Sequence, residues 1–371
     1  MIFLKFDRRI FHYFDWTLLA FVLCVCAMGV LNIYSTGFSA AGGQSPFYLK
    51  QLQWIAVGLV FMMFVFFADY RVIIEYAYII YGLAMILLVL VLIVGSSSHG
   101  AQRWLGGGFF AIQPSELMKV VIIITLARYF DNHKSNEPYT IKELFIPLLI
   151  VAVPFALILK QPDLGTALIL IVIFVSVAFF MGVDKRSLIF VFTAGLILIP
   201  LGWFLLKDYQ RERLITFLNP ERDPLGSGYH IIQSKIAIGS GEIFGKGFLS
   251  GSQTQLKFLP EQQTDFVFSV FAEEWGFLGS LFLIGLFVVI IFWGLKIALQ
   301  ARDLLGTIIA FGVTALIAWE VFINIGMVLG ILPVVGIPLP FFSYGGSAML
   351  SLMMAIGLLI NVSARRFILQ K

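Results

Sequence analysis

The sequence contains little charge. Only 12% of its 371 residues are Asp, Glu, Lys or Arg, whereas 60% are hydrophobic and the mean hydropathy is +0.97. Because a soluble globular domain carries about 25% charged residues, this composition excludes an ordinary soluble protein and indicates a polytopic membrane protein. The net charge of +4 comes mostly from Lys and Arg in short loops between apolar segments. That distribution is an orientation signal and argues against a nucleic-acid-binding surface.

Several catalytic and metal-binding patterns are also absent. The sequence has no HExxH, DxD, P-loop or GxSxG motif, and its four histidines are scattered, which argues against a protein-ligated zinc site. The two cysteines, Cys24 and Cys26, lie two positions apart in an apolar segment. They would point from different faces of a helix and could not bond to each other there. We therefore interpret them as packing residues.

Ten apolar segments are long enough, or nearly long enough, to cross a bilayer as helices, which takes about 20 residues. They cover residues 16–34, 49–68, 72–94, 115–129, 143–159, 164–181, 187–206, 265–297, 304–329 and 343–362. We expect an all-α polytopic membrane fold with about ten transmembrane helices, in a single integral membrane domain over residues 1–371. Lys and Arg gather in the loops of one side, which predicts that both termini are cytoplasmic.

One loop, residues 207–264, is too long to be a mere connector. It joins the seventh and eighth expected helices and, by the same orientation, lies on the outer side of the membrane. Residues 229–238 within it predict an amphipathic or re-entrant helix at the outer interface. The glycines between positions 239 and 247 fit either a flexible turn or a backbone nest for an anion. We expect this extracytoplasmic loop to carry the function.

Asp265 follows the loop, in the stretch 259–268, and begins an apolar segment of about 33 residues. Such a helix would be about 50 Å long, so its first turns would project beyond the bilayer and Gly276–Leu295 alone would span it. A carboxylate at the mouth of a membrane helix is costly and is therefore a catalytic candidate. A helix cap formed by Thr264 or Asp265 explains the same residues equally well. The pattern leaves both interpretations open.

Other charged residues recur toward the outer ends of the expected helices and indicate an outward-facing polar pocket. Glu116 and Lys119 are spaced i,i+3 and can neutralise each other. Asp163 precedes a helix, where it can serve as a cap. Glu320, in the ninth expected helix, is not part of this set; an uncharged residue is expected there, and the pattern does not explain the charge. The remaining members of the set are Arg103, Lys160, Arg211, Arg213, Lys235 and Lys246.

Five separated motifs resemble the SEDS family, the shape, elongation, division and sporulation proteins of bacteria, and together they cover essentially the whole chain. They are HGAQRWL at 99–105, QPSE at 113–116, QPDLGT at 161–166, LPEQQTDFVF at 259–268 and PFFSYGGS at 340–347. Residues 228–241 and 253–260 are similar to the elongation branch of the family and differ from its division branch.

The resemblance implies a peptidoglycan glycosyltransferase that polymerises lipid II on the outer face of the cytoplasmic membrane, for cell elongation and rod shape. It implies a class B penicillin-binding protein as a 1:1 partner, alongside other membrane proteins of the elongation machinery. The family's catalytic aspartate falls on Asp265. We expect substrate-binding roles for Arg103, Glu116, Lys119, Asp163, Arg211, Arg213, Lys235 and Ser343.

The implied reaction needs few groups. Converting an α-linked sugar diphosphate into a β-1,4 linkage takes one inverting displacement, for which Asp265 would take the proton of the acceptor hydroxyl. The departing polyprenyl diphosphate needs only cations or a metal, and a requirement for Mg²⁺ or Mn²⁺ is left open. Two rival classes also stay open: a flippase of the lipid-linked precursor, although no repeat symmetry is evident, and a membrane scaffold for the transpeptidase.

Overall fold

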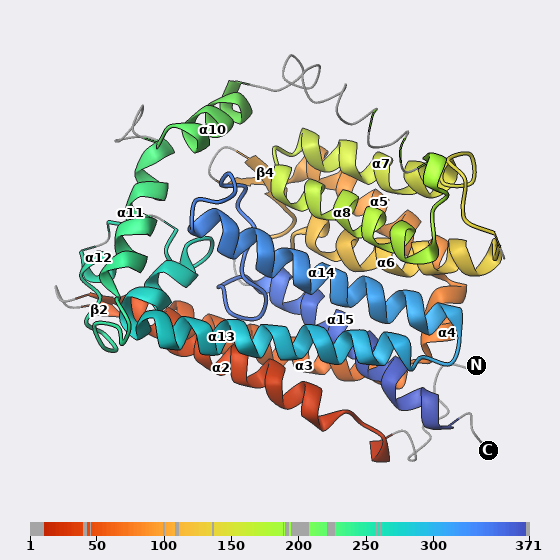
Figure 1. Ribbon diagram of the computed structural model, residues 1–371, viewed down its shortest axis with the longest axis horizontal. Coiled ribbons are helices and arrows are strands. Elements are labelled where there is room, and N and C mark those ends of the chain that lie inside the picture. The colour runs from red at the N-terminus through yellow and green to blue at the C-terminus, as the bar shows by residue number, and fades with distance from the viewer. Residues whose placement is uncertain are drawn as a thin grey trace.

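The computed structural model is a bundle of long helices with a smaller helical group at one end (Figure 1). It describes residues 11–39, 43–44, 46–98, 101–107, 111–135, 137–187, 189, 193, 208–220, 227–256, 258–259 and 261–368. In this part of the chain, seven helices are long and apolar enough to span a membrane. They are α2 (Trp16–Gly37), α3 (Phe47–Phe67), α5 (Ala77–Val94), α8 (Leu164–Met181), α13 (Val267–Leu299), α14 (Leu304–Val328) and α15 (Gly346–Ile368).

Two shorter or more polar helices complete the bundle, α6 (Pro114–Asn132) and α7 (Phe145–Lys160). Together with the seven spans they confirm the expected all-α polytopic membrane fold. The expected span over 187–206 falls almost wholly outside the described residues. The expected span over 72–94 is divided at Tyr76, which separates the short helix α4 (Tyr70–Glu75) from α5.

The remaining elements are short. Two antiparallel hairpins connect helices: β1 (Phe38–Ser39) with β2 (Gly43–Gln44), and β3 (Ser96–Ser98) with β4 (Ala101–Trp104). The described parts of the large loop form α10 (Asp208–Leu218), α11 (Ser227–Ser240) and α12 (Ser252–Gln255). A helix over 229–238 was predicted, and α11 contains it.

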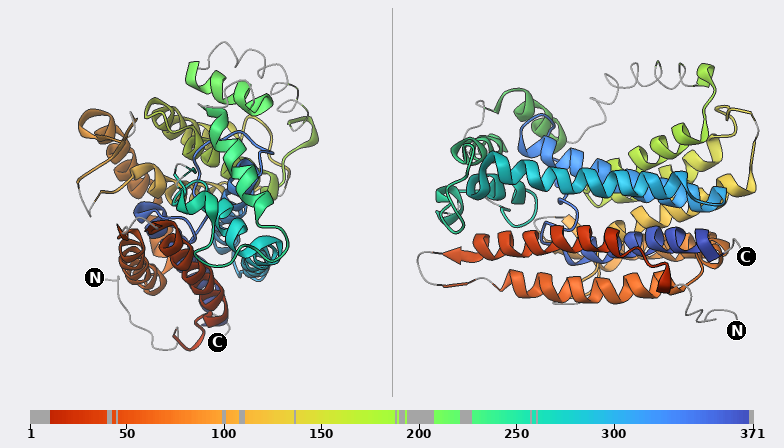
Figure 2. Two further views of the ribbon diagram at one scale, coloured as in Figure 1. Left: turned by 90° about the vertical axis from the view of Figure 1, so that its left-hand side faces the viewer. Right: turned by 60° about the horizontal axis from the view of Figure 1, so that its bottom comes forward.

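The helices are arranged so that the large loop covers one end of the bundle. In Figure 1, α10, α11 and α12 lie at one end, and α4, the beginning of α2 and the end of α15 lie at the other. We call these the loop end and the α4 end. α15 is the most deeply buried span and packs against α3, α6 and α14, while α13 and α14 run side by side (Figure 2). The beginning of α13, with Asp265 just before it, therefore lies at the loop end.

Helix α13 is broken at Gly276, whose backbone (φ 65°, ψ −163°) is not helical. The carbonyls of Glu273 and Glu274 accept instead from the N–H groups of Lys246 and Gly247, each at 3.0 Å. In turn, the N–H groups of Phe277 and Leu278 donate to the carbonyls of Glu242 and Ile243, at 2.8 and 3.1 Å. Residues 242–247 therefore make four backbone hydrogen bonds with α13, in place of the two that an unbroken helix would make across Gly276. We call this segment the clip.

Glycines allow the clip to approach so closely. A Cβ on Gly245 would lie 2.1 Å from the Glu274 carbonyl oxygen, and Gly245 itself has a φ of +79°. A Cβ on Gly241 would lie 2.0 Å from the carbonyl oxygen of Ala272. These two glycines therefore serve backbone packing against α13. The break lies at Gly276, the residue at which the sequence analysis predicts that the membrane-spanning part of this helix begins.

We predict that Gly245→Ala destabilises the protein by about 1–3 kcal/mol or more. The added Cβ combines an unfavourable positive φ with a backbone overlap that no side-chain rotation relieves. Thermal unfolding of the purified protein in detergent measures this effect. Gly239→Ala is the matched control, because no atom lies within 4 Å of the Cβ position there. Equal melting temperatures for the two variants would contradict the role given to the clip.

A polar cluster ties the helices together at the α4 end. Asp303, the N-cap of α14, accepts from Gly306 N at 2.8 Å, from Arg71 at 2.8 Å and from the Tyr70 hydroxyl at 2.9 Å. Partial burial alone would raise the pKa of the Asp303 carboxyl, but these hydrogen bonds outweigh it and hold the pKa below its ordinary value. A second pair, Arg365 with Asp69 at 3.0 Å, joins α15 to the start of α4.

We predict that Asp303→Asn lowers stability at neutral pH by about 1 kcal/mol, a modest value because the Arg71 side chain is 42% exposed. Since the folded-state pKa is lowered, the stabilisation is complete above the ordinary aspartate pKa and is lost as the pH falls through the folded pKa. Melting temperatures of wild type and Asp303→Asn are therefore expected to differ near pH 7 and to converge in acid. A difference that grows in acid would refute this assignment.

Candidate active site

Asp265 lies in a short non-helical segment at the loop end, immediately before α13. The helix begins at Val267, its N-cap position is occupied by Phe266, and the Phe266 side chain makes no capping hydrogen bond. The capping interpretation requires Thr264 or Asp265 at the N-cap position, but both residues precede it. The side chain of Asp265 is partly exposed.

The backbone around Asp265 is fixed by three consecutive carbonyls. Gln263 O accepts from Tyr344 N at 2.9 Å and Thr264 O accepts from the Ser343 hydroxyl at 2.6 Å. Asp265 O accepts from Asn324 Nδ2 at 3.0 Å. All three donors come from α14 or from the connection between α14 and α15. This segment is therefore held in one position by hydrogen bonds to a different part of the chain.

Helix α2 holds the same segment from another direction. Asn32 Nδ2 donates to Val267 O at 2.9 Å, and Gln262 Nε2 donates to Thr36 O at 3.2 Å. Gly336, in a left-handed conformation (φ +74°), faces the carboxylate, and a Cβ there would lie 3.4 Å from Asp265 Oδ2. A larger residue at 336 would therefore contact the carboxylate.

Arg103, on strand β4, is bound to the turn between α7 and α8. Its Nε donates to Gln161 O at 3.3 Å, its Nη2 donates to Pro162 O, and its Nη1 lies 3.8 Å from Asp163 Oδ1. The side chain is 31% exposed. The guanidinium thus anchors the β3–β4 hairpin to the bundle, although the side chain stays partly exposed.

Asp163 is the N-cap of α8, as the capping alternative predicted. Its Oδ1 accepts from Thr166 N at 3.4 Å. Its Oδ2 accepts from Gln113 Nε2 at 3.0 Å and from the Ser115 hydroxyl at 3.3 Å. The residue is 2% exposed. It therefore joins the start of α8 to the start of α6.

Glu116 and Lys119 form the expected i,i+3 ion pair, at 2.7 Å, on α6. Lys119 Nζ also lies 2.5 Å from Glu320 Oε1 of α14, so Glu320 gains the partner that the sequence did not provide. All three side chains are at most 5% exposed. The triad therefore links α6 to α14 beneath the loop end.

The cations of the large loop are less enclosed. Lys235 is exposed on α11, and its side chain packs against Gly330, just beyond α14. Its neighbour Ser234 contacts the Ser269 hydroxyl at 2.8 Å and donates to Val328 O at 2.6 Å, which fixes α11 against α13 and α14. Arg211 is partly exposed on α10. Arg213 belongs to the same helix, and its side chain lies outside the described residues.

The predicted residues fall into two groups at the loop end. Asp265, Ser343 and the α11 surface surround the start of α13, whereas Arg103, Asp163, Glu116 and Lys119 surround the starts of α6 and α8. Gln113 N donates to the Ser347 hydroxyl at 2.9 Å and so connects α6 to the start of α15. Sequence reasoning missed Asn324 and Gln262, whose only signal is a polar side chain within or beside an apolar run.

The described residues do not supply a metal site of their own. Within them, no three His, Cys, Asp or Glu side chains are grouped closely enough to hold an ion. Where two carboxyl groups do approach each other, Lys119 stands between them. No step is therefore assigned to a metal.

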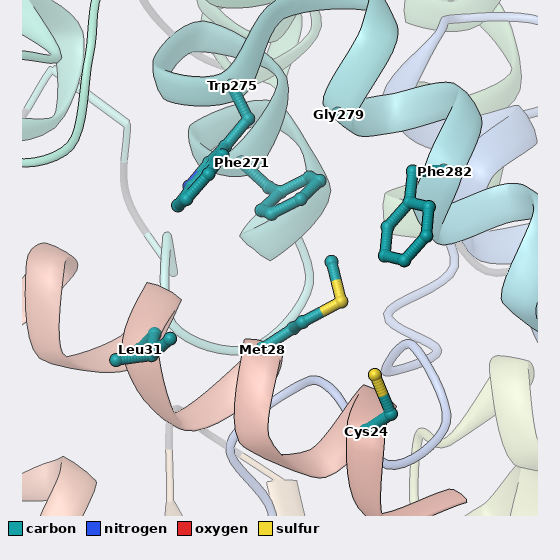
Figure 3. A pocket seen from close by; sticks show the side chains of 7 residues that line it. All are labelled: Cys24, Met28, Leu31, Phe271, Trp275, Gly279 and Phe282. Carbon is teal, nitrogen blue, oxygen red and sulfur yellow. The ribbon is translucent and has the colours of Figure 1, made fainter. Parts of the chain in front are cut away.

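An apolar groove of about 240 Å³ runs between α2 and the first part of α13. Figure 3 shows Met28 of α2 and Phe271 and Phe282 of α13 directed toward the space between the two helices. The lining includes strongly exposed side chains, among them Leu31 (51%) and Phe282 (58%), so the groove opens outward from the bundle. Phe271 is six residues after Asp265, so the groove borders the helix segment that follows the candidate carboxylate.

Comparison with known proteins places the chain in a family. A model of the FtsW, RodA and SpoVE cell cycle proteins matches residues 15–367. The chain belongs to this family. This confirms the resemblance carried by the five motifs, since FtsW, RodA and SpoVE are the division, elongation and sporulation members.

Similar relatives support the same assignment. The chain is 42% identical over 358 residues to peptidoglycan glycosyltransferase MrdB of Escherichia coli, covering 96% of this chain and 95% of the relative. It is 36% identical over 426 residues to peptidoglycan glycosyltransferase RodA of Treponema pallidum, covering 95% and 98%. It is 39% identical to stage V sporulation protein E of Bacillus subtilis, covering 94% and 96%.

Solved structures of the family have the same fold. One chain of a peptidoglycan synthase complex that coordinates polymerization and crosslinking superposes with a TM-score of 0.81 at 32% identity, covering 96% of this chain and 99% of that one. RodA of Thermus thermophilus superposes with a TM-score of 0.70 at 27% identity, covering 95% and 98%. The polytopic helical architecture is therefore that of the family.

We predict that Ser343→Ala destabilises the protein by about 1–3 kcal/mol. The Ser343 hydroxyl donates to Thr264 O and also accepts from Leu339 N at 2.8 Å, so its loss leaves a buried donor and a partly buried acceptor unpaired. Ser351→Ala is the matched control, because Ser351 is equally buried but bonds only within its own helix, to Ala348 O. Thermal unfolding compares the two, and a larger loss for Ser351→Ala would count against the anchoring role.

Proposed function

We propose that this chain polymerises lipid II into β-1,4-linked glycan, by inverting displacement of polyprenyl diphosphate, with Asp265 as the general base. The chain is a peptidoglycan glycosyltransferase of the cell-elongation type, as its relatives are. The observation that carries the mechanistic proposal is the setting of Asp265. The residue is partly exposed, whereas three successive backbone carbonyls at positions 263–265 are fixed by hydrogen bonds.

The other carboxyl groups of the helix bundle near the loop end are poorer candidates for a base. They are buried, with exposures of 4% or less: Glu116, Asp163, Glu273, Glu274 and Glu320. A general base has to reach the hydroxyl proton of a substrate, directly or through one water. Asp265 is the member of this group that an incoming sugar can approach from outside.

One carboxylate is sufficient for this chemistry. The acceptor hydroxyl loses its proton to Asp265 as its oxygen attacks the donor sugar, and the bond to the diphosphate breaks with inversion. Diphosphate leaves without a proton donor if cations balance its charge. A glycosidase, by contrast, needs two carboxyl groups at a defined separation.

We assign the diphosphate contacts to the accessible cations. The Arg103 side chain is 31% exposed, and Lys235 is exposed beside the start of α13. Arg211 and Arg213, on α10, are assigned to the same role at the outer edge of the site. Lys119 acts differently in this proposal, because its buried ammonium group already contacts Glu116 and Glu320. Its role, with Asp163 and Ser343, is to hold the site in shape.

The apolar groove between α2 and α13 is suited to part of a polyprenyl chain. It is lined by seven apolar or small residues and opens outward from the bundle, which is where a lipid tail would lie. Its volume of about 240 Å³ is below that of a typical ligand pocket. It would therefore take a segment of the chain near the diphosphate and leave the remainder in the bilayer.

Location and partner follow from the same proposal. The protein is a multi-pass membrane protein, and we place it in the bacterial inner membrane with the loop end facing outward and both termini in the cytoplasm. We propose a class B penicillin-binding protein as partner in a 1:1 complex, because a structural relative is a chain of a peptidoglycan synthase complex. Contacts with other membrane proteins of the elongation machinery belong to this proposal, and nucleic acid does not.

We predict that Asp265→Asn abolishes polymerisation, with a loss of about 10²–10⁴-fold, because the amide keeps the shape of the side chain and cannot accept the proton. The measurement is lipid II polymerisation by the purified protein with its partner, followed by gel separation of the glycan strands. Glu261→Gln is the matched control: it removes a carboxylate four residues away that is exposed, and its rate is expected to stay near that of wild type.

Three outcomes would overturn the mechanism. If Asp265→Asn polymerises within a few-fold of wild type, Asp265 is not the base. If the wild-type complex moves lipid II across vesicles without forming glycan, the protein is a flippase. If it does neither and still binds its partner, it is a scaffold.

A further inference from the structure

Glu320 is a buried carboxyl group whose two oxygens have different surroundings. Oε1 accepts from Lys119 Nζ at 2.5 Å. Oε2 is buried and has no hydrogen-bond partner among the described residues. A charged carboxylate oxygen left unpaired in such a place is costly, and this requires an explanation.

The charges around Glu320 do not balance if every group is ionised. Both charged neighbours come from α6: Lys119 and, beyond it, Glu116. Two carboxylates and one ammonium would leave a net charge of −1 in a site where all three side chains are at most 5% exposed. An unbalanced charge buried within a membrane helix bundle is unfavourable. One proton on the triad removes it.

Asn324 lies one helical turn from Glu320 on α14 and is also fully buried. Both hydrogens of its Nδ2 are used, since it donates to Asp265 O at 3.0 Å and to Ile337 O at 2.7 Å. These two bonds fix which way the amide points, so Oδ1 faces away from them. In the described structure Oδ1 is buried and unpaired. Two acceptor atoms, Glu320 Oε2 and Asn324 Oδ1, thus stand one turn apart without a donor.

We propose that Glu320 is held as a neutral carboxylic acid whose Oε2–H group donates to Oδ1 of Asn324, and that it thereby positions Asp265. The single proton satisfies both unpaired oxygens and makes the Glu116–Lys119–Glu320 triad neutral. It also completes a chain of hydrogen bonds from α6 through Lys119, Glu320 and Asn324 to the backbone of Asp265. Glu320 is a positioning residue in this scheme and does not touch substrate.

The positioning role rests on the proposed function of Asp265, whereas the proton on Glu320 does not. The two parts are therefore tested separately. The proton is tested spectroscopically on the purified protein without substrate, and the positioning role by polymerisation assays.

For the proton, the infrared difference spectrum between wild type and Glu320→Gln is recorded in detergent near neutral pH. We expect the wild type to show a carboxylic-acid carbonyl band that the variant lacks. Glu75→Gln, which removes an exposed carboxylate on α4, is the matched control and is expected to lose carboxylate bands instead. If Glu320→Gln also loses only carboxylate bands, Glu320 is ionised and the proposal is wrong.

For the link to Asn324, the same band is compared in wild type and Asn324→Ser. Loss of the acceptor is expected to shift the carbonyl band, because its frequency depends on the hydrogen bond that the acid donates. A band at an unchanged position means that the proton points elsewhere. This measurement needs neither enzymatic activity nor the Glu320→Leu variant.

For positioning, lipid II polymerisation is compared in Glu320→Gln and Glu320→Leu. Gln can donate to Asn324 and accept from Lys119, so it is expected to stay within about threefold of wild type. Leu leaves Asn324 Oδ1 unpaired and is expected to lose about tenfold or more. Equal rates for the two variants, high or low, would refute positioning. If Asp265→Asn proves active while the infrared band is present, the proposed function fails and the protonation of Glu320 stands.

Discussion

A backbone N–H or carbonyl group that faces lipid finds no water to bind, so every such group in this protein has to be satisfied by the protein itself. Regular helices meet this requirement alone, and interrupted ones do not. The break in α13 at Gly276 exposes polar groups that the clip then satisfies with four hydrogen bonds. The non-helical segment before α13 is satisfied by Tyr344, Ser343 and Asn324. The candidate base therefore stands on irregular backbone that is nevertheless held in place.

Buried charge obeys a similar rule near the loop end. Glu273, which is fully buried, accepts from Lys246, from Ser252 and from the backbone N–H of Gln253. Asp163 has three donors, and Lys119 has a carboxyl group on each side. These charged groups connect segments that are distant in sequence, and most of their hydrogen-bonding capacity is taken by those contacts. They differ from Asp265 in burial, because Asp265 is partly exposed.

The sequence predicted features that depend on neighbouring residues. Hydrophobic run lengths gave most of the spans, the excess length of the α13 segment gave a division at Gly276, and spacing gave both the Glu116–Lys119 pair and the cap at Asp163. Features that depend on distant contacts were not predicted. Glu320 pairs with a residue 201 positions away, and the glycines of the clip appeared to be a loose turn because their α13 contacts cannot be seen in a linear pattern. The span over 187–206 and the Arg213 side chain stay predictions.

The exchange of hydrogen bonds at the α13 break also determines how the loop end can open. If residues 242–247 moved away from α13, four backbone groups of the helix and four of the clip would lose their partners together. A partial separation of the clip from α13 is unfavourable, because it leaves backbone N–H and carbonyl groups without hydrogen-bond partners and brings no new partners within reach. The clip and the helix segment that follows Asp265 therefore form a single cooperative unit, so a force applied to the clip is transmitted to the helix that begins directly after the candidate carboxylate.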